Sequence, residues 1–338
     1  MYINWLHHYT PKFAAVLSVF VNFFFIYILQ NDKKVKLGNY RFLLLFFAMY
    51  NLIVTAGDVL VPLGIHCHRY AFSIFIADGV FEHKSYYGRI AICMRCSLVP
   101  ASYAVLHAHF VYRFLALFAT KFLHKWFLPY GLILTVVYSI LMMSVWFIGS
   151  YYFIFADPER RLYLEKPFQD LYNTDVFDLN MLVALYNEAS SDVIHDSWTG
   201  VIMITCSSVD SVLLYFILGA LIIIKLNSNQ LLLSKNTIKM QGQLMKALVV
   251  QAAIPIFVNF APCLVSWYQP VFNMDFGRWI YTFASVAIAF FPVLDPIALF
   301  YFIPTFRRRI REILKVKKKL PKAALSVEIT KSTHTRST

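Results

Sequence analysis

Six ionisable side chains stand inside long apolar stretches of this sequence: Asp58, Arg95, His107, His109, Asp210 and Asp295. In hydrocarbon such a group costs about 2.5–3.5 kcal/mol on insertion scales, so each needs a partner or a wet cavity. Asp58 and Arg95 carry opposite charges in consecutive stretches. Two interpretations of this pair are open: part of a polar ligand site, or an ion pair that only fixes the register of two helices.

The same residues give little support to enzymatic or metal chemistry. His107 and His109 are two positions apart, and on a helix such side chains point about 200° apart, so they cannot bind one metal ion. The sequence contains no GxSxG, HExxH, glycine-rich phosphate loop or Walker motif. Asp210 and Asp295 could serve a proton-coupled carrier, although the two halves of the chain show no repeat. We therefore expect no enzyme, no cofactor and no metal, with a membrane carrier or channel as the alternative function.

The composition identifies the class of protein. Of the 338 residues, 59% are hydrophobic and 14% are charged, whereas soluble domains have roughly 45–50% and about 25%. The net charge of +13 could indicate nucleic-acid binding, but the charges lie between the apolar stretches rather than among them. The sequence predicts an integral membrane protein that binds no nucleic acid.

Seven stretches are long enough to cross a bilayer, which requires roughly 20 apolar residues of helix. They cover residues 13–29, 42–61, 90–117, 127–155, 201–224, 244–267 and 279–303. The first is followed by lysines and lacks a small-residue cleavage site, so we expect an uncleaved helix. The fold class predicted is an all-α membrane protein, a bundle of seven transmembrane helices over residues 1–303.

The basic residues predict the orientation of this bundle. The segments 31–41, 113–125, 225–246 and 304–338 contain 22 of the 31 lysines and arginines, and the segments on the other side contain 8. Because basic residues concentrate on the cytoplasmic side, the N-terminus is expected outside and the C-terminus inside. The outer segment 156–197, with nine acidic residues, is expected to form a solvated lid.

The chain after the last span divides into two parts. Residues 304–320 place apolar side chains near one helical face and basic ones over the rest, which predicts an amphipathic helix along the anionic inner leaflet of membrane lipid. A simple stop-transfer cluster of charges is the alternative. Residues 321–338 are polar and rich in Ser and Thr, so we expect a disordered cytoplasmic tail.

Several strings of residues resemble those of one family in order and depth. They are Gly38-Asn-Tyr-Arg41, His109-Phe-Val-Tyr-Arg-Phe-Leu-Ala116, Gln243-Leu-Met-Lys246 with the following helix to Pro255, and Pro292-Val-Leu-Asp-Pro-Ile-Ala298. Together they are similar to the Str-type seven-transmembrane chemoreceptors of nematodes. The resemblance implies a G-protein-coupled chemosensory receptor of olfactory type. Its partners would be a small odorant or soluble cue and a heterotrimeric G protein, in the plasma membrane of a sensory-neuron cilium.

Candidate site residues follow from this topology. We expect ligand between the outer halves of the second, third, fifth, sixth and seventh helices, bordered by Asp58, Arg95, Asp210 and Trp267. At the cytoplasmic side we expect coupling to the G protein through Tyr112, Arg113, Lys239 and Lys246. The alternative is that these basic residues only set the topology. No acid precedes Arg113, so the acid–arginine pair of rhodopsin-like receptors is absent.

Two further features concern the helices themselves. Pro255 and Pro262 remove backbone donors from the sixth helix and should kink it. Cys67 precedes the third helix and Cys93 opens it, so a bridge between them is the expected disulfide, with Cys96 as the alternative partner. Unbridged thiols remain equally open, because spacing alone does not show geometry.

Overall fold

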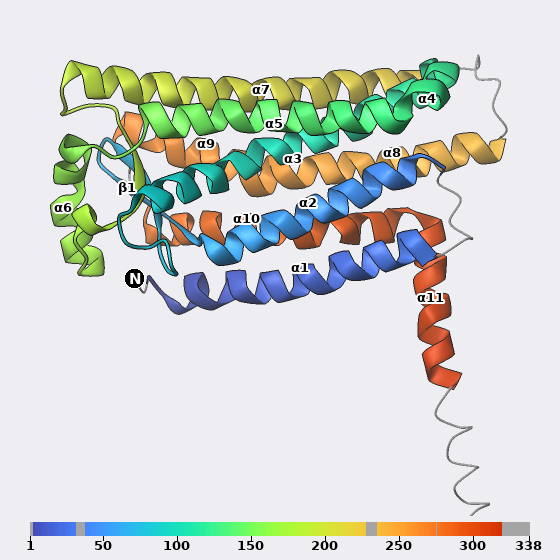
Figure 1. The fold of residues 1–338 in the computed structure, drawn as a ribbon, viewed down its shortest axis with the longest axis horizontal. Coiled ribbons are helices and arrows are strands. Elements are labelled where there is room, and N and C mark those ends of the chain that lie inside the picture. The colour runs from blue at the N-terminus through green and yellow to red at the C-terminus, as the bar shows by residue number, and fades with distance from the viewer. Residues whose placement is uncertain (1–2, 32–37, 228–234, 275, 320–338) are drawn as a thin grey trace, which may run out of the picture.

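The structure, a computed structural model, describes residues 3–31, 38–227, 235–274 and 276–319. Seven helical segments are long and apolar enough to cross a membrane, and they pack side by side along one axis (Figure 1). They are α1 (Trp5–Asn31), α2 (Tyr40–Leu60), α3 (Tyr86–Phe118), a fourth span over Phe127–Phe153, α7 (Ser191–Asn227), a sixth span over Gln241–Phe272, and α10 (Arg278–Phe302). The predicted seven-helix bundle is confirmed.

The fourth and sixth spans are interrupted helices. The fourth consists of η1 (Phe127–Gly131), α5 (Leu132–Ile148) and η2 (Gly149–Phe153), and it follows the short α4 (Thr120–Trp126). The sixth consists of α8 (Lys235–Pro255), the π-helical turn η4 (Ile256–Phe260), α9 (Ala261–Tyr268) and η5 (Gln269–Phe272). The π turn lies between Pro255 and Pro262, where missing backbone N–H groups interrupt the regular ladder.

One end of the bundle, here called the capped end, carries a small sheet that the sequence analysis did not predict. Strands β1 (Leu63–His68), β2 (Ala71–Ile76) and β3 (Met181–Leu185) form an antiparallel sheet in that order. Ile65 pairs with Ile74, and Ser73 of β2 pairs with Val183 of β3. The sheet joins the segment after α2 to the segment after the fourth span, so the all-α description holds for the spans but not for this cap.

The acidic segment 156–197 is a folded part of the capped end rather than a solvated lid. It contains α6 (Pro158–Tyr172), the turn η3 (Val176–Asp178) and β3. Arg161 on α6 is 1% exposed, and its guanidinium donates to the carbonyls of Ala156, Val176 and Leu179. Burial lowers the pKa of Arg161. The acidic residues mark only the outer surface of a segment that has a core of its own.

Helix α3 forms the centre of the bundle. It packs against α2, α5, α7 and α8, and 78% of its most apolar part is buried, compared with 17% in Phe127–Phe153. Large apolar side chains such as Phe20, Leu134 and Phe216 are exposed on the outer helices, where hydrocarbon rather than water surrounds a membrane protein. Polar groups are therefore collected inside the bundle, along α3.

The opposite end of the bundle, here called the α11 end, carries α4 and α11 (Pro304–Lys319). Helix α11 leaves α10 at a steep angle and runs across the bundle axis (Figure 1). Its Phe306 is fully buried and lies edge-on to Phe25 of α1, with ring centroids 5.5 Å apart. The expected tail over 321–338 lies outside the described residues.

Candidate functional site

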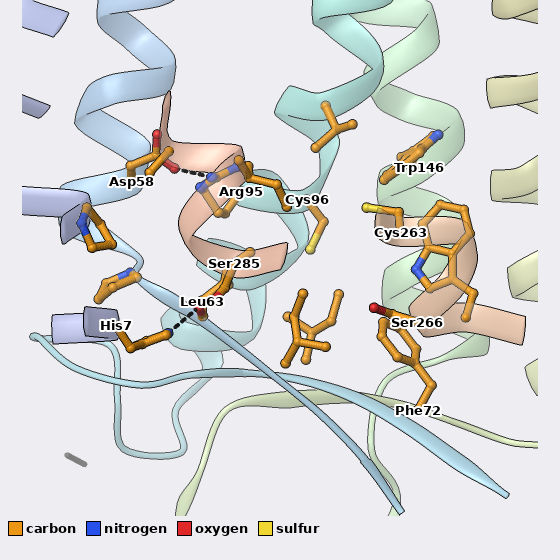
Figure 2. Close-up of a pocket in the computed structure, with 18 residues that line it drawn as sticks. His7, Asp58, Leu63, Phe72, Arg95, Cys96, Trp146, Cys263, Ser266 and Ser285 are labelled. Carbon is orange, nitrogen blue, oxygen red and sulfur yellow. Dashed lines mark hydrogen bonds and ion pairs between the residues drawn. The ribbon is translucent and has the colours of Figure 1, made fainter. Parts of the chain in front are cut away.

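A cavity lies at the capped end, between the spans and the sheet (Figure 2). It has a volume of about 60 Å³ for the centre of a water-sized sphere, several times the roughly 10–15 Å³ that one water requires. Its walls come from α1, α2, β1, β2, α3, α5, α9 and α10. Lining residues are His7, Pro11, Asp58, Pro62, Leu63, Ile65, Phe72, Ile74, Arg95, Cys96, Val99, Trp146, Cys263, Ser266, Trp267, Ser285, Ile288 and Ala289. The walls are therefore mostly apolar, with a few polar groups.

An ion pair between Asp58 and Arg95 lies on one side of the cavity (Figure 2). The side chains are 8% and 5% exposed, and the guanidinium donates from Nη2 to Oδ1 of Asp58. Gly57 permits this approach of α2 to α3, because a Cβ there would lie 2.9 Å from Leu98 and 3.3 Å from the Cδ of Arg95. The sequence-based pairing of Asp58 with Arg95 is present, and it faces a cavity.

Aromatic side chains form the opposite wall. Trp146 of α5 and Trp267 of α9 meet edge to face, with ring centroids 5.6 Å apart, and both are buried. The neighbouring Ser266 has a buried hydroxyl that makes no hydrogen bond within the described part of the chain. Trp267 thus joins Asp58 and Arg95 around the cavity, as expected, and Ser266 offers a further polar group.

The hairpin of β1 and β2 closes the cavity on the capped side. Leu63, Ile65, Phe72 and Ile74 line the cavity from the hairpin, and the carbonyl of Leu63 accepts a hydrogen bond of 3.0 Å from Nε2 of His7 on α1. The first helix therefore holds the hairpin in place. Sequence reasoning missed this closure, although a short apolar run rich in aromatic and β-branched residues, such as 71–76, is typical of a buried strand.

The expected disulfide is not formed in the structure. Cys67 lies on β1 and donates its thiol to the carbonyl of Ser266 at 3.4 Å. Cys93 and Cys96 on α3 are free, buried thiols. The thiol of Cys67 instead ties the hairpin to α9, on the far side of the cavity from α1.

Asp210 is the one predicted ligand residue that the cavity does not include. It lies on α7 with an exposed side chain, on the side that faces the fourth span. Its carboxylate interacts electrostatically with His107 of α3 and Tyr138 of α5. The structure therefore separates Asp210 from Asp58, Arg95 and Trp267.

A second polar cluster lies in the middle of the bundle. Asp295 of α10 is 1% exposed and accepts hydrogen bonds from Gln251 of α8 at 2.9 Å and from Asn51 of α2 at 3.4 Å. Asn22 of α1 donates to the carbonyl of Pro292 at 2.9 Å. The cluster around Asp295 thus connects the first, second, sixth and seventh spans.

Arg113 occupies the α11 end of α3. It is 4% exposed, its guanidinium carbon lies 3.7 Å from the centre of the Tyr40 ring, and Nη1 donates to Gln241 of α8 at 3.1 Å. Its Nε and Nη2 form no hydrogen bond among the described residues. In place of the acid that rhodopsin-like receptors use, an amide of the sixth span and an aromatic ring hold this arginine.

The other predicted coupling residues lie on α3 and α8. Tyr112 is half-buried and meets Phe127 edge-on at 4.7 Å between centroids. Lys246 is exposed on α8. Lys239 is in the same helix, but its side chain lies outside what the structure describes. Gln241, which contacts Arg113, was not predicted, because an uncharged amide near a helix end carries no distinctive sequence pattern.

Comparison with known proteins identifies the family. The sequence model of the serpentine type seven-transmembrane GPCR chemoreceptor Srj matches residues 1–310. The chain belongs to this family. Serpentine receptor class J-38 of Caenorhabditis elegans is 37% identical over 316 residues, which cover 92% of this chain and 94% of the relative. The G-protein coupled receptor str-33 of the same species is 24% identical, covering 89% of each chain.

More distant serpentine receptors match over a similar length. Serpentine receptor class r-10 of Caenorhabditis briggsae is 25% identical over 312 residues, covering 88% of this chain and 87% of the relative. The chain is therefore a G-protein-coupled chemosensory receptor with seven spans, of a family with nematode members, rather than a carrier or channel. The expected kinship with nematode chemoreceptors is confirmed, and the class that the family model shows is Srj.

Proposed function

We propose that the cavity at the capped end is the site where this Srj receptor binds a small external cue. The observation that carries the proposal is the buried Asp58–Arg95 pair beside an otherwise apolar cavity. Ligand sites are typically concave and mostly apolar, with a few polar groups that fix orientation. The cavity volume of about 60 Å³ suits a small odorant or soluble cue rather than a peptide.

The ligand class follows from the polar groups that remain available. Arg95 Nε forms no hydrogen bond with a described residue, and neither does the hydroxyl of Ser266. A guanidinium only donates, so a ligand with a carbonyl or other acceptor suits the Arg95 side. Trp146 and Trp267 provide the apolar wall opposite. The cue proposed is a small, mainly apolar molecule with one hydrogen-bond acceptor.

The sixth span connects this cavity to the α11 end. Ser266 and Trp267 of α9 line the cavity, and α9 continues through η4 into α8, where Gln251 contacts Asp295 and Gln241 contacts Arg113. The π turn at Ile256–Phe260 gives the span a place to bend. A cue that binds better when α9 is displaced would shift the population toward a state in which Gln241 has left Arg113.

The membrane orientation proposed places the α11 end in the cytoplasm. Of the basic residues, 22 lie in segments at that side against 8 at the other. Tyr112, Arg113, Lys239 and Lys246 would then lie near the end of the bundle that meets the heterotrimeric G protein. The basic α11 would lie along the lipid of the inner leaflet. Residence in the plasma membrane of a sensory-neuron cilium remains part of the proposal.

One experiment tests the cavity directly. The receptor is expressed in a heterologous cell, volatile and water-soluble cues are screened by calcium response, and an active cue is then applied to Ala289→Phe. Ala289 lines the cavity, so the added ring should occupy the space and abolish the response while surface expression persists. Ala287→Phe makes the same change on α10 at a position outside the cavity lining. If Ala289→Phe responds normally, the cue binds elsewhere.

A further inference from the structure

A second hollow opens on the membrane-facing side of the bundle, between α3, α4, η1, α5 and α7. This groove encloses about 750 Å³ and shares no lining residue with the cavity at the capped end. Phe122, Trp126 and Tyr130 line the part near the α11 end, and His107, Tyr138 and Leu214 line the part toward the middle of the bundle. Most of its lining residues belong to membrane spans, so a molecule dissolved in the bilayer could enter it.

The inner part of the groove presents hydrogen-bond acceptors. Nε2 of His107 lies 3.1 Å from the carbonyl of Ser211, which can only accept, so Nε2 carries the proton. With the ring neutral, Nδ1 then accepts the hydroxyl proton of Tyr138 at 3.0 Å. The O–H of Tyr138 is therefore already engaged as a donor to His107. The Tyr138 oxygen can still accept a hydrogen bond through its lone pairs.

Asp210 adds a negative charge beside this part of the groove, one helical turn before the lining residue Leu214. It lies on α7 four residues before Leu214, so both side chains are on one face of the helix, and its carboxylate interacts electrostatically with His107 and Tyr138. Its side chain is exposed in the middle of a span, and no hydrogen bond or ion pair to it is found among the described residues. An exposed carboxylate at this depth is costly without a partner.

We propose that this groove binds a membrane-partitioned cationic amphiphile, a long-chain amine whose ammonium group pairs with Asp210. The ammonium supplies three donors for the carboxylate and the Tyr138 oxygen, and the chain lies along Trp126 and Tyr130. A sterol hydroxyl would supply one donor without charge, and a phosphate would add negative charge to a site of acceptors. Charge complementarity therefore selects the amine.

The test uses the full chain in phosphatidylcholine nanodiscs, with a photoreactive dodecylamine as probe and the matching dodecanol as its uncharged control. Peptide mass spectrometry should find amine labelling within Phe127–Tyr138 or around Leu214, and excess dodecylamine should suppress it. Asp210→Asn should weaken amine labelling about tenfold, which corresponds to about 1.4 kcal/mol. Leu214→Trp, which fills the groove and keeps Asp210, should abolish it.

Asp192→Asn is the matched control, since it removes an exposed acid from the first turn of the same helix, outside the groove. Labelling should be unchanged in this variant. Equal labelling by amine and alcohol, or full labelling in a monodisperse Asp210→Asn receptor, would overturn the proposal. Suppression by cholesterol but not by dodecylamine would also overturn it and assign the groove to a sterol.

Discussion

Two buried arginines on α3 carry the polar chemistry of this receptor. Arg95 and Arg113 lie about 27 Å apart along the helix at roughly 1.5 Å per residue, one beside the cavity and the other at the α11 end. Each is held by a neighbouring span, Arg95 by Asp58 of α2 and Arg113 by Gln241 of α8. Substitutions at the two positions should therefore affect different steps, cue binding and G-protein activation.

At the cavity, we expect Arg95→Ala to abolish the response to the cue. The variant leaves the buried Asp58 carboxylate without its partner, and breaking such a pair costs about 3–5 kcal/mol. The double variant Asp58→Asn with Arg95→Gln removes both charges, so its surface expression should recover while the response stays lost. Flow cytometry and calcium dose–response curves measure the two effects. A normal dose–response curve for either variant would show that the pair is not part of the binding site.

At the α11 end, the partners of one hydrogen bond should give opposite phenotypes. Arg113→Ala should retain membrane insertion and cue binding but lose G-protein activation. Gln241→Ala should raise basal activation, because it removes the contact between α3 and α8 and leaves Arg113 in place. Nucleotide exchange on Gα with purified receptor measures both. Lys235→Ala, which removes one of many basic charges, serves as the control and should change neither basal nor cue-stimulated activation. A loss of activation in all three variants would argue against a specific role for Arg113.

At the scale of elements, the segments between spans differ most from expectation. Their polar residues suggested loops, yet 62–89 and 156–197 combine into a sheet and α6. Arg160 and Arg161 explain part of this difference. Both side chains are buried, and they donate hydrogen bonds to backbone carbonyls in the turns of this segment. A charge count classifies these arginines as surface residues, whereas the fold uses them as internal donors.

We expect Arg161→Met to destabilise the capped end. The substitution removes this donor from the buried carbonyls of Ala156, Val176 and Leu179. The Val176 carbonyl keeps the N–H of Leu179 at 3.4 Å, and each of the other two costs about 1–3 kcal/mol when it is left unsatisfied. The free energy of unfolding should therefore fall by about 3 kcal/mol or more. Thermal unfolding and limited proteolysis within 156–197 measure the change. Lys166→Met on the exposed face of α6 is the matched control, and equal melting temperatures for the two variants would contradict a structural role for Arg161.

At the scale of the whole molecule, the orientation can be read with two engineered glycosylation sites. The natural sequence has no N-x-S/T triplet, so any glycan reports the new site. Asp175→Thr creates an acceptor at the exposed Asn173 of the capped end, and Leu231→Thr creates one at Asn229 between the fifth and sixth spans. The first should be glycosylated and the second should not. Glycosylation of Asn229 would contradict the predicted orientation. Staining of a C-terminal tag in unpermeabilised cells would contradict it as well.

The sequence by itself determined the class of fold and the number of spans. Those features depend on local quantities, because the transfer free energy of a 20-residue stretch is nearly a sum over its own residues. Only the tertiary structure decided which polar groups meet. Trp267 lines the cavity and Asp210 does not, although both were expected to border the ligand site. The rotation of each helix and the folding of the hairpin over the cavity depend on packing between segments far apart in sequence, which no local pattern encodes.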